Sequence, residues 1–299
     1  AEGVTRGQIG EASILSGAGK VGNAVVAITG STFDTGQFTI TVEDVVGAQQ
    51  RVTESLISWT DRNGVILART ASLGAVNSAL VLNGDITINM SDLLVRAGGT
   101  ATLNGQISGT RSLTRTDSGT TIVTNAANNF TGGVSVSHGV LQTASIADAG
   151  VASAIGAGTT INLGQGTYAG SDTGTLRYSG PTASTNRTVQ MQSNSAAGRP
   201  GIEVTTAGTV LTFNGTFQYS SGSTDGRWFL KGAGDGIING NILTAGAGLT
   251  KQGTGTWTLN GANTYTGTTI LDQGVLILGS TGGPAIVGNV QMGAGNTNQ

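Results

Sequence analysis

Short runs in which apolar and polar residues alternate recur along most of this chain. The run Gln37–Glu43 places Phe38, Ile40 and Val42 on one side, which is the period of two residues that predicts a half-buried β-strand. No window shows the period of 3.6 residues that an amphipathic helix requires, and glycine and threonine are too frequent for stable helices. The pattern therefore predicts an all-β protein.

From about residue 71 the pattern becomes monotonous, with short predicted strands such as Thr159–Leu163, Thr209–Phe213 and Thr256–Leu259. Glycine-containing pairs separate these strands. Asn-Gly pairs at 83–84, 214–215, 239–240 and 260–261 can supply the positive φ that sharp corners require, and they can equally mark hairpin turns. The turn residues alone do not decide between stacked coils and hairpins.

Two segments of the chain have nearly the same sequence. They are LTRTDSGTTIVTNAANNFTGGVSVSHGVL at 113–141 and LTKQGTGTWTLNGANTYTGTTILDQGVL at 249–276, the first with one inserted residue. The repeated unit is much longer than a hairpin, and equivalent positions carry equivalent residue types. These features favour a parallel solenoid with roughly 20–25 residues per coil, in which like residues stack. The aligned pairs are Gly119 with Gly255, Phe130 with Tyr265, Gly132 with Gly267, Gly139 with Gly274, and Leu141 with Leu276.

Composition narrows the classes of protein that this chain can be. Its 299 residues include 51 Gly, 3 Pro and no Cys, and the net charge is −2. The absence of cysteine excludes disulfides and thiolate metal sites. Near-zero charge without a basic run argues against a nucleic-acid or anionic-membrane partner. Apolar runs such as Ala24–Ile28 are too short for a transmembrane helix.

Charge is unevenly distributed, because residues 1–70 hold 12 of the 30 Asp, Glu, Lys and Arg residues. We therefore expect residues 1–70 to form a β-rich N-terminal cap or assembly segment and residues 71–299 to form the repeat domain. The first residue is Ala1 rather than Met, which agrees with a signal peptide already removed from an exported protein.

The segment GTGTWTLNGANTYTGTTILDQGVL (253–276) resembles the autotransporter-associated β-strand repeat, also called the passenger-associated transport repeat. The segment at 113–141 is a degenerate copy, with Thr121 where the other has Trp257 and no clean equivalent of Gly261. Text similar to that family covers about residues 71–299. The repeat residues that we single out are Gly119, Phe130, Gly132, Gly139, Leu141, Gly255, Trp257, Leu259, Asn263, Tyr265, Gly267, Gly274 and Leu276.

The resemblance implies a right-handed parallel β-helix in an extracellular bacterial surface protein. We expect a structural role, as a fibre, a stalk or an adhesin element of an autotransporter passenger. The alternatives are a glycan-binding adhesin module and a polysaccharide-degrading β-helix enzyme. The expected partners are other copies of the chain, packed head-to-tail or laterally, or a host-surface or glycan ligand.

Candidate catalytic residues are few. His138 is the one histidine, so any Ser-His-Asp triad or imidazole metal site would need it. It lies two residues after Val136 and four after Val134, so the alternation of the strand predicts an inward position at a corner. The Gly-x-Gly-x-x-Gly match at 17–22 precedes the strand-like segment Asn23–Ile28 instead of the helix that dinucleotide binding requires.

Carboxylates are sparse, and their spacing does not predict an acidic cleft on one face of the solenoid. Asp225 and Asp235 are the residues whose removal would test for an enzyme. Arg115 and Lys251 are equivalent in the internal alignment, and we expect both at solvated strand edges. We predict no catalytic residue, no metal and no cofactor.

Possible binding surfaces remain. Thr254, Thr256 and Thr258 alternate with core positions, which predicts an outward threonine face. Such a face can bind ice or glycans, and it is also what any solenoid exposes. The phase predicts that Trp257 is buried, whereas the phase of Trp228 is ambiguous, so Trp228 is the first aromatic residue to consider for stacking on a sugar.

Overall fold

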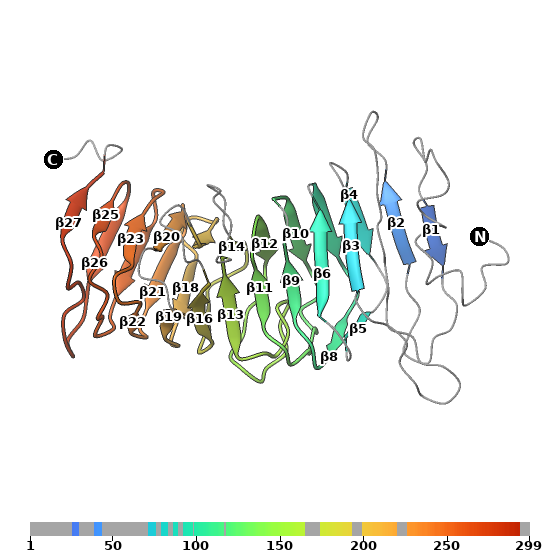
Figure 1. The fold of residues 1–299 in the computed structure, drawn as a ribbon, viewed down its shortest axis with the longest axis horizontal. Helices are drawn as coiled ribbons and strands as arrows, with labels where there is room; N and C mark the ends of the chain where they lie inside the picture. The colour runs from blue at the N-terminus through green and yellow to red at the C-terminus, as the bar shows by residue number, and fades with distance from the viewer. Residues whose placement is uncertain are drawn as a thin grey trace. The chain divides into compact units, whose positions relative to one another are not determined.

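The computed structural model describes residues 26–29, 39–43, 71–75, 79–82, 86–88, 92–97, 99–116, 118–164, 174–192, 199–219 and 226–293. Every regular element in these ranges is a β-strand (Figure 1). The described ranges contain no helix with the length and apolarity needed to cross a membrane. The chain divides into two compact units, one of residues 1–134 with 151–158 and the other of residues 135–150 with 159–299.

The first unit contains three ladders of parallel strands, β3–β6–β9, β4–β7–β10 and β5–β8. Two further strands, β1 and β2, are antiparallel to each other, and β2 is antiparallel to β4. The strands are β1 (Val26–Thr29), β2 (Thr39–Glu43), β3 (Ala71–Ala75), β4 (Ala79–Leu82), β5 (Ile86–Ile88), β6 (Leu93–Ala97), β7 (Thr100–Leu103), β8 (Ile107–Gly109), β9 (Leu113–Arg115) and β10 (Thr120–Val123).

Residues 1–70 are described only at β1 and β2. These two strands pair antiparallel, in contrast to the parallel coils that follow. Most of the expected cap lies outside the described residues, including Trp59 and the glycine motif at 17–22. The division of the chain at residue 70 therefore stays a prediction.

The second unit is built from three parallel sheets. The long sheet has the order β12–β14–β17–β20–β23–β25–β27, and the other two are β13–β16–β19–β22 and β15–β18–β21–β24–β26. Strand β11 (Val134–Val136) lies at the boundary of the two units. The remaining strands are β12 (Val140–Thr143), β13 (Thr160–Leu163), β14 (Thr175–Tyr178), β15 (Ala183–Thr185), β16 (Thr188–Met191), β17 (Gly201–Val204), β18 (Val210–Phe213), β19 (Phe217–Tyr219), β20 (Arg227–Gly232), β21 (Asp235–Ile238), β22 (Ile242–Leu243), β23 (Gly248–Lys251), β24 (Thr256–Leu259), β25 (Thr269–Leu271), β26 (Val275–Leu278) and β27 (Val290–Met292).

Parallel strands that follow one another at intervals of one coil are the mark of a β-solenoid, so the predicted all-β parallel β-helix is confirmed. The register gives the coil length directly. Thr100 pairs with Thr120 and Leu249 with Thr269, each 20 residues apart, whereas Gly201 pairs with Phe229, 28 residues apart. The predicted spacing fits the coils in the two repeats, and coils between them are longer.

Alternation along each strand produces the core. In β24 the residues Trp257 and Leu259 are buried while Thr256 and Thr258 are partly exposed, because successive side chains point to opposite faces of a strand. The same pattern of alternate burial recurs in β7, β10, β12, β13, β16, β18 and β21.

Trp257 has its smallest neighbour in the preceding coil of the core. Gly236 of β21 is in register with Trp257 of β24, and a methyl group on Gly236 would overlap the indole ring. Glycine at 236 therefore makes room for the largest side chain of the repeat. The indole Nε1 of Trp257 has no hydrogen-bond partner, so its packing must offset that cost.

The replacement Gly236→Ala should destabilise the second unit by about 1–3 kcal/mol, because the new methyl group overpacks the core against Trp257. Urea unfolding followed by tryptophan fluorescence measures this change. Gly282→Ala is the matched control, since nothing lies within 4 Å of a methyl group there. Equal unfolding midpoints for the two variants would show that the core around Gly236 and Trp257 is not tightly packed.

Candidate functional site

The buried polar side chains of the two repeats form the most distinctive chemistry of the described chain. Asn263, at the corner after β24, is 1% exposed. Its Oδ1 accepts a hydrogen bond from the backbone N–H of Ile242 at 2.7 Å, and its Nδ2 donates to the backbone oxygen of Ala285 at 2.7 Å. These partners lie 21 and 22 residues away in opposite directions. One amide side chain therefore bonds its own coil to the coil before it and the coil after it.

Asn128 does the same in the degenerate repeat. It is fully buried, accepts from the N–H of Ile107 at 2.7 Å, and donates to the oxygen of Ala154 at 2.8 Å. Asn263 is among the predicted repeat residues, whereas Asn128 is not. The signal was available, because the offset that aligns Phe130 with Tyr265 also aligns these two asparagines.

Lys251 is buried in the core, which corrects the expectation of a solvated edge. Its exposed fraction is 0%, and it is in register with Leu230 of the preceding coil. Its Nζ donates to the backbone oxygens of Gln252 (2.9 Å), Gly253 (2.7 Å) and Gln273 (3.1 Å). Burial lowers the pKa of Lys251 from 10.5 to about 8, and Asp235 opposes part of this shift. The ammonium group satisfies corner carbonyls that the strands leave without partners.

Arg115, the equivalent residue of the other repeat, is also inside. It is 1% exposed and in register with Val95. Its Nη1 donates to the oxygen of Val95 at 3.0 Å and its Nε to the oxygen of Gly119 at 3.3 Å. Both repeats thus use an inward cation to bind the backbone at the same corner, and the solvated-edge expectation was wrong for both.

Arg187 is a third buried cation, and it lies outside the repeats. It is fully buried, and its Nε donates to the oxygen of Ala147 at 3.0 Å. Burial lowers its pKa to about 10, and Asp148 opposes the shift. The sequence does not indicate that Arg187 is buried, because an arginine directly before Thr188 is typical of the polar end of a strand.

The other repeat residues take equivalent places. Phe130 and Tyr265 are buried, and the hydroxyl of Tyr265 bonds Oγ1 of Thr269 at 2.8 Å. Gly139 and Gly274 have φ of 67° and 76°, a region that favours glycine. A methyl group on Gly132, Gly255 or Gly267 would overlap the backbone of the preceding coil. Leu141, Trp257 and Leu259 are buried, Gly119 accepts the bond from Arg115, and Leu276 is half-buried.

The Asn-Gly corners work differently from the sequence prediction. Gly215, Gly240 and Gly261 are not among the glycines with positive φ. They are required because a methyl group on each would overlap the backbone of the coil before it. The asparagines that precede them form an exposed ladder, in which Asn260 donates to Asn239 and Asn239 donates to Asn214, both at 2.8 Å.

The candidates for catalysis do not come together. His138 is 8% exposed, as its phase predicted. The described residues contain no group of three or more His, Cys, Asp or Glu side chains that could hold a metal ion. Asp235 accepts a hydrogen bond from the N–H of Thr256 at 2.6 Å, and Asp225 lies outside the described residues.

Trp228 does not offer a sugar-stacking surface, because it is 1% exposed. Its ring packs edge-on against Phe217 with centroids 5.3 Å apart. Trp257 is buried as predicted, and Thr254, Thr256 and Thr258 line the outward face. A glycan-binding surface must therefore use residues other than these two tryptophans.

The replacement Asn263→Ala should lower the free energy of unfolding by about 2–4 kcal/mol, because it leaves the buried N–H of Ile242 and the oxygen of Ala285 without partners. Asn260→Ala is the control, since it removes one exposed amide–amide bond and should cost less than about 1 kcal/mol. Urea titration of both variants measures the difference. Equal losses would mean that Asn263 does not bind three coils together.

Lys251 predicts a dependence of stability on pH. In the folded protein the pKa of Lys251 is about 8, whereas in the unfolded chain it has its ordinary value of 10.5. Between these values the unfolded chain binds more protons than the folded protein, so stability should rise with pH. Below pH 8 the lysine is charged in both states, and the full cost of burying the charge applies. The rise ends near pH 10, because burial raises the pKa of Tyr178 and Tyr265. These tyrosines ionise more readily in the unfolded chain and therefore lower the stability above that pH.

Thermal unfolding of the wild type and Lys251→Met between pH 7.5 and 9.5 tests this prediction. The wild type should gain stability relative to the variant as the pH rises. Lys231→Met, which changes a partly exposed lysine, should run parallel to the wild type. Parallel curves for all three proteins would contradict the assignment of a buried ammonium group.

Comparison with known proteins agrees with this geometry. Residues 113–143 and 249–278 match the family model of the passenger-associated-transport-repeat. Over 192 residues the chain is 32% identical to the adhesin BmaC autotransporter of Brucella suis biovar 1 (strain 1330), and the aligned region is 62% of this chain but 5% of that protein. No solved structure matches the chain. The chain thus carries two passenger-associated transport repeats, each forming corners of a β-solenoid, and it is similar to a small part of an autotransporter adhesin.

Proposed function

We propose that this chain is a load-bearing section of the surface-exposed passenger of an autotransporter adhesin. Its two transport repeats and its similarity to an autotransporter adhesin support this role. The observation that carries the mechanical part is the pair of buried asparagines, each bonded to the coil before it and the coil after it. A side chain in that position resists separation of the coils on both sides.

The acidic side chains support a structural role over an enzymatic one. Each of the five whose side chains are described contacts a residue of a neighbouring coil. The contacts are Asp92 with the N–H of Ser112, Asp148 with the N–H of Asn186, Glu203 with Arg177, Asp235 with the N–H of Thr256, and Asp272 with Gln252. We infer that these carboxylates bind coils to one another and that the chain is not an enzyme.

The proposed place of action is the bacterial surface or the space outside it, after export and removal of a signal peptide. Partners would be a host-surface or glycan ligand on an outer face of the solenoid. Self-association, head-to-tail or lateral, stays a prediction.

Force spectroscopy on the whole chain, held at both ends, tests the load-bearing role. Because each coil contacts only its neighbours, the chain should unfold in small steps. A coil of 20–35 residues should release about 70–120 Å of chain. Asn263→Ala should lower the force of the steps in the second unit. One or two large steps at low force would contradict the proposal.

A further inference from the structure

The basic side chains of the second unit are concentrated on one sheet. Its six Lys and Arg residues include Arg187 and Lys251, which are fully buried. The other four all lie on or beside β14, β17 and β20, three consecutive strands of the long sheet, and they are Arg177, Arg199, Arg227 and Lys231.

The register places these four side chains in two groups on the outer face. Arg177, Glu203 and Lys231 are in register on successive coils, so they are about 5 Å apart from rung to rung. The second group lies further along the same strands. Gly201 pairs with Phe229, two residues before the pair of Glu203 and Lys231. Arg199 and Arg227 lie two residues before Gly201 and Phe229, hence about 7 Å from that pair along the strands.

Phe229 lies between the two groups, and its ring contacts one cation from each of them. The Cζ atom of Arg199 is 5.6 Å from the ring centroid, and the Nζ atom of Lys231 is 5.5 Å from it. Phe229 belongs to an outward position, between the inward Trp228 and Leu230, yet it is only 6% exposed. Cation–π contacts of this kind restrict where the two charges can lie.

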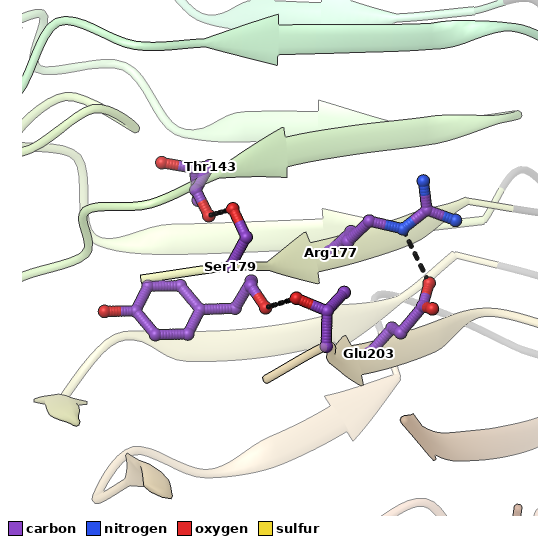
Figure 2. A network of polar contacts seen from close by, with 6 residues as sticks. Thr143, Arg177, Ser179 and Glu203 are labelled. Atoms are coloured by element: carbon purple, nitrogen blue, oxygen red, sulfur yellow. Dashed lines mark hydrogen bonds and ion pairs between the residues drawn. The ribbon is translucent and has the colours of Figure 1, made fainter. Parts of the chain in front are cut away.

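The remaining contacts orient the other two cations. Arg177 donates from Nε to Glu203 at 2.8 Å, as Figure 2 shows between β14 and β17. Arg227 donates from Nη1 to the oxygen of Thr268 at 3.0 Å. Among the described residues of this face, four cations and one carboxylate give a net charge of +3, in a chain whose total charge is −2. Arg199 and Arg227 place like charges on adjacent rungs, a pairing that costs stability instead of adding to it.

We propose that the outer face of β14, β17 and β20 binds an acidic polysaccharide through its carboxylate or sulfate groups. Positive charges at a regular rung spacing fit a chain that carries an anion on successive sugars, and partial exposure to water allows exchange of counterions. A nucleic acid fits less well, because single strands bind through stacking on exposed aromatic rings and Phe229 is covered. The choice of a polysaccharide rests on the proposed role in an adhesin.

Binding of the whole chain to immobilised dextran sulfate, compared with neutral dextran, tests the proposal. The wild type should bind only dextran sulfate, and the affinity should fall as salt rises. The double variant Arg199→Gln/Lys231→Gln should lose at least roughly tenfold in affinity, and the slope of log affinity against log salt should fall by about two, one for each cation removed. Circular dichroism and the urea midpoint verify that each variant is folded.

Two further variants separate this face from general attraction of anions. Arg111→Gln removes an exposed arginine of the first unit and should leave binding unchanged, whereas Arg199→Gln alone should weaken it. Glu203→Gln should strengthen binding, because it removes the one described carboxylate of the face. Absence of binding to dextran sulfate, equal losses in Arg111→Gln and Arg199→Gln, or tighter binding of single-stranded DNA would overturn the proposal. None of these results would alter the unfolding steps under force, so the load-bearing role is tested separately.

Discussion

The described structure depends on one constraint, which is that every coil must satisfy its backbone groups with the coils on either side. Straight segments do this through parallel strand ladders, but corners break the ladders and leave N–H and C=O groups buried without partners. The two repeats solve this problem with side chains that point inward. Asn128 and Asn263 bind backbone groups of adjacent coils, and Arg115 and Lys251 donate to the corner carbonyls of Gly119 and Gly253. These side chains therefore bond backbone groups at corners that the strand ladders do not reach.

This solution has an energetic cost that explains several other features. A cation in an apolar column loses its hydration, so it is tolerated only where carbonyl oxygens surround it. Lys251 has three such oxygens. A thin core also leaves little freedom in the size of side chains, which is why Gly236 lies against Trp257 and why glycines stack at the Asn-Gly corners. The outer faces are free of these limits, and it is there that we place ligand binding.

Much of the fold could be predicted from the sequence, because its signals are local or repeated. Alternation in segments such as Thr256–Leu259 predicts strands, and the matched texts at 113–141 and 249–276 predict coils in register. The errors arise where a residue type has two physical roles. Lysine and arginine usually lie in water, so Lys251 and Arg115 were assigned to the surface, and their burial depends on carbonyls from other coils that no local pattern shows. The basic outer face was missed for a similar reason, since Arg177, Arg199 and Lys231 are far apart in sequence and meet only through the register.

Hydrogen exchange at single amides tests the central claim most directly. If the corner asparagines bind consecutive coils, the N–H groups of Ile107 and Ile242, which donate to Asn128 and Asn263, should exchange as slowly as amides in the middle of β7 and β24. Asn263→Ala should release Ile242 while leaving Ile107 protected. Rapid exchange of both amides in the wild type, at the rate of exposed loops, would contradict the account.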